Sequence, residues 1–331
     1  MTQPRLVDED DQVTRRASVA RNTAPHDATR GDVVGAERGP TLRTLLRLGR
    51  ISNLPTVWTN CLAALALAGG SFEPQSFVVA ALAMSFAYTG GMFLNDAFDR
   101  EIDARERPER PIPSGEISAG PVFALGFGQL SLGVLLVAAL GPLTGGPLNL
   151  PAVVAALVLC GVIVLYDVHH KQNPLSPLVM GLCRVGVYAT VGLAFAPRPL
   201  ELPWPLLVGA LLLLGHLIGL TYVAKQENLG SVKGFWPLVL LAGPVLFGIS
   251  RSGDELAVLG FVVLLVGLEL WALSLLRRVP PRIPQAVITL IAGISLVDAV
   301  LLASVGQWAL GALAVGGCGL TLGLQRWVRG T

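Results

Sequence analysis

Ten apolar segments, most of them long enough to cross a membrane as a helix, dominate this chain of 331 residues. Hydrophobic residues make up 53% of the sequence and charged residues only 14%, whereas a soluble domain is usually about 25% charged. The composition excludes a soluble enzyme, a disulfide-stapled secreted domain and a disordered chain. It predicts an all-α polytopic transmembrane bundle with up to ten spans, because about 20 apolar residues cross the hydrocarbon core. The segments cover 54–71, 76–95, 120–140, 150–166, 175–196, 203–222, 235–250, 255–276, 285–304 and 307–325.

The polar regions between these segments predict the orientation. Most of the 24 Lys and Arg residues precede the first segment or lie in loops predicted on the same side, and the opposite loops contain only Arg198 and Arg251. Because cytoplasmic loops are enriched in Lys and Arg, we expect a cytoplasmic N-terminus and a cytoplasmic 96–119 loop, in a cell inner (plasma) membrane. Residues 1–40 are polar and mixed in charge, which predicts a disordered tail before a transmembrane domain at 41–331.

An acidic cluster at the cytoplasmic end of the second segment carries the clearest chemical signal. A helix advances about 100° per residue, so four polar residues of the cluster share one helix face. Stacked carboxylates at a membrane boundary are costly unless divalent cations lie among them. Mg²⁺ binds one or two carboxylates together with phosphate oxygens and water. The pattern favours a Mg²⁺–diphosphate site over the alternative, a solvated acidic loop paired with neighbouring arginines. The four residues are Asn95, Asp96, Asp99 and Asp103.

A family resemblance follows from this cluster and the loop after it. Asn95, Asp99 and Asp103 form an NxxxDxxxD run, and residues 110–115 read RPIPSG. The combination resembles the first signature of the UbiA superfamily of intramembrane prenyltransferases, which is the same run followed by a basic loop ending in RPxxxG. The likeness extends from about Leu42 to the C-terminus.

The resemblance implies a helical bundle around a lipid-facing cavity, closed on the cytoplasmic side by a cap of loops. The family core has nine helices, so nine to ten spans are expected, with the tenth segment arising from division of 285–325 at Gly306 and Gln307. It implies Mg²⁺-dependent transfer of a prenyl group from a prenyl diphosphate to an aromatic or other small acceptor within the membrane. Tyr166 and Lys171 are similar to the Tyr…Lys/Arg element after the family's fourth helix. No nucleic acid is expected as a partner.

The resemblance also implies roles for individual residues. Asn95, Asp99 and Asp103 would hold Mg²⁺ and the diphosphate, with Asp96 close by. The chemistry agrees, because ionising an allylic diphosphate requires that the charge of the leaving group be neutralised. The side chains expected to contact phosphate oxygens are Lys171 and one or more of Arg105, Arg107 and Arg110.

The family's second acidic signature is altered in this chain. Where a second aspartate pair is expected, residues 221–228 read TYVAKQEN, and Glu227 is the only acid. Three interpretations stay open: Glu227 helps to hold a second Mg²⁺, Lys225 replaces that ion as the counter-charge of the phosphate, or the site no longer catalyses. We therefore predict Lys225 and Glu227 as catalytic residues, Glu227 also as a metal ligand, and Tyr222 as a substrate contact.

Two polar residues within apolar segments are further candidates for substrate binding. Arg184 lies about two turns into the segment 175–196, where an unpaired charge is expensive. It binds an anionic acceptor group or the diphosphate, or it forms an ion pair with Glu269 or Asp298. Asn53, at the start of the first segment, contacts the acceptor or caps a helix.

Three classes of function compete. The first is a prenyltransferase, the second is a catalytically weak UbiA-like accessory protein in a lipid or secondary-metabolite pathway, and the third is a secondary transporter. A transporter places its polar residues near the membrane midplane, usually in repeated halves. Here the densest polar cluster lies at one membrane boundary and no repeat is visible in the sequence. Mg²⁺-dependent release of diphosphate separates the first class from the second.

Overall fold

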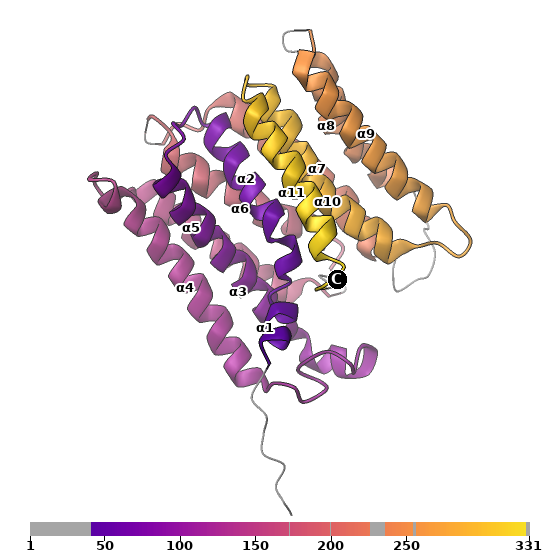
Figure 1. Cartoon of the computed structure of the whole chain (residues 1–331). Coiled ribbons are helices and arrows are strands. Elements are labelled where there is room, and N and C mark those ends of the chain that lie inside the picture. The colour runs from indigo at the N-terminus through magenta and orange to yellow at the C-terminus, as the bar shows by residue number, and fades with distance from the viewer. Residues whose placement is uncertain (1–40, 172, 199, 226–235, 254–255, 329–331) are drawn as a thin grey trace, which may run out of the picture. The chain divides into compact units, whose positions relative to one another are not determined.

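The computed structural model describes residues 41–171, 173–198, 200–225, 236–253 and 256–328. Every regular element in these ranges is a helix, which confirms the predicted all-α fold (Figure 1). The predicted tail at 1–40 lies outside the described residues. The elements are α1 (Leu42–Leu48), the 3₁₀ helix η2 (Ile51–Asn53), α2 (Leu54–Leu67), α3 (Pro74–Glu106), α4 (Ala119–Leu143), α5 (Leu150–His169), α6 (Ser176–Phe195), α7 (Trp204–Lys225), the 3₁₀ helix η4 (Trp236–Leu241), α8 (Ala242–Arg251), α9 (Leu256–Leu276), α10 (Ile283–Ala303) and α11 (Trp308–Leu324).

Each of the ten apolar segments contains a helix. Seven of these helices, α3 to α7, α9 and α10, are long and apolar enough to cross a membrane by themselves. The other three are shorter, with 14 residues in α2, 10 in α8 and 17 in α11. α10 and α11 are separate helices, joined by a turn in which Gly306 adopts a φ of 75° that favours glycine.

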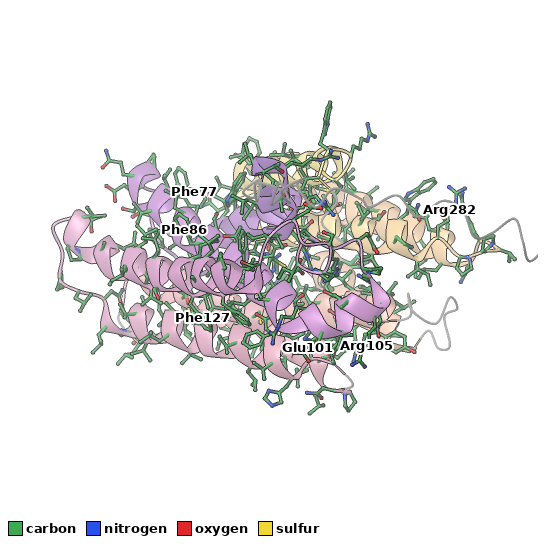
Figure 2. The ribbon with its side chains drawn as sticks, turned by 90° about the horizontal axis from the view of Figure 1, so that it is seen from below. Phe77, Phe86, Glu101, Arg105, Phe127 and Arg282 are labelled. Atoms are coloured by element: carbon green, nitrogen blue, oxygen red, sulfur yellow. The ribbon has the colours of Figure 1, made fainter. Side chains whose placement is uncertain are left out.

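The helix α10 lies at the centre of the bundle. The most apolar window of α10 is 89% buried, against 28% for the corresponding windows of α4, α5 and α9. It packs against α2, α7, α9 and α11. The outer helices instead expose apolar side chains such as Phe127 of α4 (Figure 2). A polar side chain on α10 is therefore enclosed by protein, whereas the outer helices present a surface suited to lipid.

The helix α3 is longer than a membrane span needs to be, and it carries the acidic cluster near its C-terminal end. It has 33 residues and so extends about 50 Å, compared with about 30 Å of hydrocarbon. Close packing against α4 fixes its position: a Cβ atom added to Gly90 would lie 2.8 Å from the carbonyl oxygen of Gly126. Small residues of this kind allow membrane helices to approach closely.

Loops gather at the end of the bundle where α3 terminates. α1 lies at this end (Figure 1) and contacts the loop between α3 and α4. Thr44 Oγ1 donates to Glu116 Oε2 at 2.9 Å, and Arg47 Nη1 donates to Glu116 Oε1 at 3.4 Å. Leu48 also joins a small apolar cluster with Phe93, Ile117 and residues of α3 and α4. We call this end the cap end.

Candidate functional site

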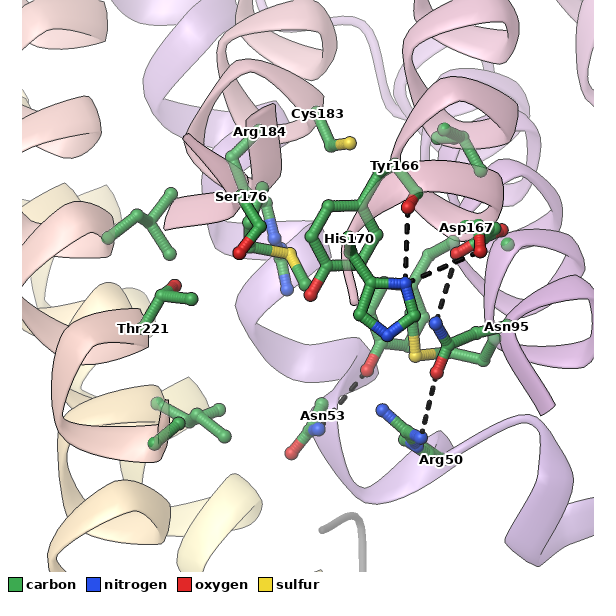
Figure 3. Close-up of a pocket in the computed structure, with 18 of the residues that line it drawn as sticks. Arg50, Asn53, Asn95, Tyr166, Asp167, His170, Ser176, Cys183, Arg184 and Thr221 are labelled. Atoms are coloured by element: carbon green, nitrogen blue, oxygen red, sulfur yellow. Dashed lines mark hydrogen bonds between the residues drawn. The ribbon is translucent and has the colours of Figure 1, made fainter. Parts of the chain in front are cut away.

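A cavity of about 340 Å³ extends into the bundle from the cap end (Figure 3). Its volume lies within the range of small-molecule sites. Its walls come from η2 and α2, α3, α5, α6, α7 and α10. The cap-end part carries charged side chains, and the deeper part is largely apolar. The apolar side chains of α5, α7 and α10 that line the cavity are Leu159, Ile163, Leu217, Leu220, Ala224, Val287, Ile291 and Ile294.

The four polar residues of the predicted α3 face are all buried, with exposed fractions between 2% and 8%. Asn95 and Asp99 line the cavity, whereas Asp96 and Asp103 lie behind Arg110, which lines it. Arg110 Nη1 donates to Asp96 Oδ1 at 3.1 Å and to Asp103 Oδ2 at 2.8 Å. Arg110 therefore shields two carboxylates from the cavity.

Arg50 reaches the same face from the linker between α1 and α2. Its Nη2 donates to Asp96 Oδ1 at 3.2 Å and to Asn95 Oδ1 at 3.3 Å. Burial alone lowers the pKa of Arg50, but the Asp96 carboxylate and weaker contributions from other groups raise it above its ordinary value. Its backbone is left-handed, with φ 44° and ψ 46°, which is uncommon for a residue with a side chain. Arg50 was not among the site residues predicted from the sequence.

Two basic side chains at the end of α5 hold Asp99. Lys171 Nζ and His170 Nε2 each lie 3.3 Å from Asp99 Oδ2. His170 stacks on Tyr166, with ring centroids 4.8 Å apart, and its Nδ1 lies 3.2 Å from the Tyr166 carbonyl oxygen. Lys171, predicted to contact phosphate oxygens, contacts a carboxylate of the predicted metal-binding face here. His170 was missed, although its spacing of four from Tyr166 on one helix face was a usable signal.

Asp167 is a further carboxylate that the sequence interpretation missed. It lines the cavity and is 3% exposed. Asn95 Nδ2 donates to its Oδ1 at 3.2 Å, and within the described residues its Oδ2 has no hydrogen-bond partner. Figure 3 shows Asp167, Asn95 and Arg50 joined by these contacts. Because the Asp167 carboxylate must receive the amide NH₂ of Asn95, the Asn95 carbonyl oxygen points toward the cations.

The altered second motif is only partly described. Lys225 lines the cavity at the end of α7, and its Nζ donates to the Asn173 carbonyl oxygen at 2.7 Å. On α7, Thr221 and Ala224 line the cavity within the described residues, and Tyr222 is not among the lining side chains. Glu227 lies outside the described residues.

Two further predicted residues, Asn53 and Arg184, each contact Tyr88. Asn53 Nδ2 donates to the Tyr88 hydroxyl at 3.1 Å, and Asn53 Oδ1 accepts from Gln325 of the C-terminal region at 2.6 Å. The Arg184 guanidinium lies over the Tyr88 ring at 5.2 Å. Asn53 makes no side-chain capping bond to α2, so helix capping does not account for it. Asn53, Tyr88 and Arg184 all line the cavity.

Arg184 forms neither of the direct ion pairs considered for it. Its Nη1 donates to Asn60 Oδ1 at 2.9 Å and its Nη2 to Thr56 Oγ1 at 3.0 Å. Asn60 Nδ2 in turn donates to both carboxylate oxygens of Asp298, at 2.8 and 3.1 Å. Asp298 is thus linked to Arg184 through an amide. The other candidate, Glu269, lies 3.6 Å from a His216 ring nitrogen instead.

The donor set at the cap end suits Mg²⁺. Carboxylate and amide oxygens are its preferred protein ligands, and it completes its coordination with phosphate oxygens and water. Within the described ranges, no three His, Cys, Asp or Glu side chains are grouped tightly enough to hold a metal ion by themselves. The buried Asp167 oxygen without a partner leaves carboxylate capacity at this end of the cavity. The residues fit an ion that arrives together with a diphosphate.

The family model of UbiA prenyltransferases matches residues 56–330. The chain belongs to this family. The prediction of a prenyltransferase is therefore confirmed at the level of the family, and the chain is a multi-pass membrane protein. Arg110 and the Asn95-x3-Asp99-x3-Asp103 run lie within the matched region.

Individual relatives point in the same direction. The chain is 29% identical over 293 residues to the digeranylgeranylglyceryl phosphate synthase of Methanopyrus kandleri, covering 86% of this chain and 97% of that protein. It is 42% identical over 120 residues to the enzyme of that name from Ignicoccus hospitalis, which is 38% of the length of that relative.

Solved structures share the fold. A structure from work on a digeranylgeranylglyceryl phosphate synthase in membranes aligns with a TM-score of 0.55 at 20% identity, over 83% of this chain and 99% of that one. An apo UbiA homologue from Aeropyrum pernix K1 aligns with a TM-score of 0.51 at 16% identity, over 84% and 98%. At these identities the likeness concerns the fold, which confirms a UbiA-like helical bundle.

Proposed function

We propose that this protein transfers a prenyl group from a prenyl diphosphate to a small acceptor inside the membrane and requires Mg²⁺ to do so. One observation carries the proposal. A cavity with apolar walls ends at a cluster of carboxylates and cations, so a single ligand with an apolar tail and a charged head fits both parts. Membership of the UbiA prenyltransferase family supports this assignment.

Some residues of the cap end bind the metal ion, and others bind the phosphate oxygens. Asp99 and Asp103 hold Mg²⁺, with Asn95 as a further ligand, and Asp96 anchors Arg110 beside them. Mg²⁺, when bound, supplies charge that stabilises the departing diphosphate. The cations that contact phosphate oxygens are Arg107, Arg110 and Lys171, all of which line the cavity.

For Asp103 to reach the ion, Arg110 has to leave it. The diphosphate offers Arg110 a better partner, because a guanidinium binds phosphate oxygens through two parallel hydrogen bonds. Arg110 therefore moves from carboxylate to phosphate as the substrate binds. The same exchange transfers Lys171 from Asp99 to the diphosphate.

The deeper walls protect the cationic prenyl fragment from water. Aliphatic side chains of α5, α7 and α10 surround this part of the cavity, and exclusion of water prevents hydrolysis of a reactive intermediate. The rings of Tyr88 and Tyr166 line the cavity as well. Aromatic faces stabilise a nearby cation.

At the altered second motif, Lys225 supplies the positive charge that a second metal ion provides elsewhere, and Glu227 orients it. The place of Lys225 in the cavity wall supports this role. Tyr222 stays a candidate substrate contact. The competing role for Glu227 is metal ligation. Comparison of Lys225→Ala with Glu227→Gln distinguishes metal ligation from orientation of Lys225.

The acceptor and the orientation complete the proposal. The relatives named digeranylgeranylglyceryl phosphate synthase make a glyceryl phosphate the first acceptor to try, followed by aromatic acids. The basic residues of the cap end, Arg50, Arg107 and Arg110 among them, support a cytoplasmic location for this end and for the N-terminus, in the inner membrane.

The test is release of diphosphate by the purified protein in lipid nanodiscs. Geranyl, farnesyl and geranylgeranyl diphosphates are supplied with Mg²⁺ or EDTA, with and without an acceptor panel. We expect Mg²⁺-dependent release with at least one donor and its loss in Asp99→Asn. Release that is absent with every donor while the protein stays folded, or that persists in EDTA, contradicts the proposal and favours an accessory role.

A further inference from the structure

The deep wall of the cavity holds a guanidinium that is not directly neutralised. Arg184 is 9% exposed and lines the cavity. In the described part of the chain, its side-chain hydrogen bonds go only to the neutral groups of Asn60 and Thr56, and no carboxylate lies within the 4.0 Å of an ion pair. A guanidinium has five N–H groups, so donors remain for a ligand.

The nearest carboxylate in this network is already satisfied by other groups. Asp298 is fully buried and accepts from Thr59 Oγ1 at 2.6 Å and from the Tyr188 hydroxyl at 2.5 Å. It also receives both bonds from Asn60 Nδ2. Its negative charge is therefore stabilised by four hydrogen bonds that do not involve Arg184.

The network fixes the direction of the Arg184 guanidinium. Because a carboxylate only accepts, Asn60 must turn its NH₂ group to Asp298 and its oxygen to Arg184. Thr56 holds the second nitrogen, and the Tyr88 ring covers one face of the group. A cation held in this way needs no rearrangement to receive an anion, which is the property of a prepared binding site.

The position of Arg184 separates it from the diphosphate. Tyr88 precedes Asn95 by seven residues on α3, which is about two turns and about 10 Å along the same helix face. Arg184 contacts Tyr88, whereas Lys171 and Arg110 contact Asp99 and Asp103 further along α3. The cavity thus has two cationic places, one at the cap end and one deep inside.

We propose that Arg184 binds an oxyanion of the acceptor, and that this protein selects acceptors carrying a carboxylate or phosphate group. The inference rests on the proposed function and names the residue and the chemical group through which the acceptor is recognised. The acceptor's nucleophilic atom lies toward the cap end and its anion lies on the deep wall near Tyr88. Asn60 and Asp298 are positioning residues, since they act through Arg184.

Binding of matched acceptors tests this without any chemical turnover. The full chain in nanodiscs is saturated with Mg²⁺ and inorganic diphosphate, which occupy the cap end, and no prenyl donor is present. Two pairs of probes are titrated by calorimetry: 4-hydroxybenzoate with its neutral amide, and geranylgeranylglyceryl phosphate with neutral geranylgeranylglycerol. The first pair detects a carboxylate acceptor and the second a phosphate acceptor.

We expect at least one anion to bind about tenfold more tightly than its neutral partner, because hydrogen bonds to a charged group are strong. Arg184→Met removes that preference and leaves the neutral probe unchanged, and Arg184→Lys restores part of it. Lys171→Met, which removes a cap-end cation, keeps the preference. Thr56→Val preserves the charge and weakens the preference about threefold, so the test holds even where Arg184→Met fails to fold.

A preference that survives in Arg184→Met overturns the inference, as does a wild-type protein that binds no anion better than its neutral partner. Equal loss of the preference in Lys171→Met also overturns it, because the anion then binds at the cap end. The proposed function is judged separately by Mg²⁺-dependent release of diphosphate from the prenyl donor, so the two failures are distinguishable.

Discussion

Among the described residues, buried carboxylates lie near cations both at the cap end and on the deep wall of the cavity, and the two groups are arranged differently. At the cap end, Arg110 contacts Asp103 at 2.8 Å and Lys171 contacts Asp99 at 3.3 Å. On the deep wall, an amide separates Arg184 from Asp298. A direct ion pair can be exchanged when another ligand offers equivalent contacts. The Asp298 carboxylate accepts four hydrogen bonds from buried groups, so a ligand in the cavity cannot replace them. It therefore holds Asn60, and through Asn60 the Arg184 guanidinium, in one orientation.

One cavity can therefore combine an end whose ion pairs are exchanged on ligand binding with an end whose hydrogen bonds stay in place. The cap-end pairs keep carboxylates neutralised until a metal ion and a diphosphate replace the partners. The deep network stays as it is and orients a cation for a second ligand. Substitutions at each end should therefore have different effects.

Among these variants, we expect Asp99→Asn to cause the largest loss of activity. It removes one charge at constant volume, so metal binding and the contacts of Lys171 and His170 are lost together. We expect Mg²⁺-dependent diphosphate release to fall about 10³-fold, or about 4 kcal/mol of transition-state stabilisation. Single-turnover kinetics measure the loss. The melting temperature should stay close to that of the wild type, and a variant that instead retains most of its rate contradicts the assignment of Asp99.

Asp298→Ala breaks the deep network and should act mainly on stability. It leaves the donors of Asn60 and Tyr188 without the acceptor they use, and Arg184 without its nearby negative charge. Loss of one partner of a buried charged network costs about 3 kcal/mol or more. Thermal unfolding in detergent measures this. Asp298→Asn is the matched control, because it keeps the volume and restores some acceptor capacity. Equal melting temperatures for Asp298→Ala and wild type rule out the network as a rigid support.

Arg110→Met sharpens the contrast by freeing carboxylates that Arg110 shields. With Arg110 gone, Asp96 and Asp103 repel each other and attract a divalent cation. Mn²⁺ binding without diphosphate should therefore tighten about tenfold, whereas the KM for the prenyl diphosphate rises because a phosphate contact is missing. Titration of Mn²⁺ by electron paramagnetic resonance measures the first effect. Weaker Mn²⁺ binding in this variant indicates that Arg110 does not compete with the ion.

Lys225→Ala and Glu227→Gln separate the two roles open at the altered motif. If Lys225 is the counter-charge of the phosphate, its removal should lower kcat about tenfold, more than the change at Glu227 does. Both variants are measured across a Mg²⁺ titration. Greater damage in Glu227→Gln, partly rescued by excess Mg²⁺, identifies Glu227 as a metal ligand and contradicts the role given to Lys225.

Glu116→Gln should have the smallest effect. Glu116 joins α1 to the cap loop through Arg47 and Thr44, but the Arg47 and Glu116 side chains are each 38% exposed. Exposed ion pairs contribute about 0–1 kcal/mol, so we expect a small fall in melting temperature and unchanged release of diphosphate. A large loss of activity assigns α1 a part in closing the cavity.

The helices of the bundle were predictable because their signal is local. Runs of apolar residues mark them, and proline at the first or second position, such as Pro74 in α3 and Pro284 in α10, marks several starts. The shared face of Asn95, Asp99 and Asp103 was predictable for the same reason, because it depends only on helical periodicity within α3.

The partners of these residues were not predictable from the sequence. The contact of His170 with Asp99 depends on how α5 is rotated against α3, and the link from Arg184 to Asp298 joins α6 to α10 through α2. From the sequence, two roles were open for Arg184: binding of an anionic ligand, or an ion pair with Glu269 or Asp298. It contained no signal that Asn60 would stand between the two charges.

The most direct test of this account measures Mn²⁺ binding with and without inorganic diphosphate in the wild type, Asp99→Asn, Asp103→Asn and Asp298→Asn. Exchangeable cap-end pairs predict that diphosphate strengthens Mn²⁺ binding in the wild type and in Asp298→Asn, and that both aspartate variants of α3 lose this effect. Mn²⁺ binding that is indifferent to diphosphate, or that survives in Asp99→Asn and Asp103→Asn, contradicts the account.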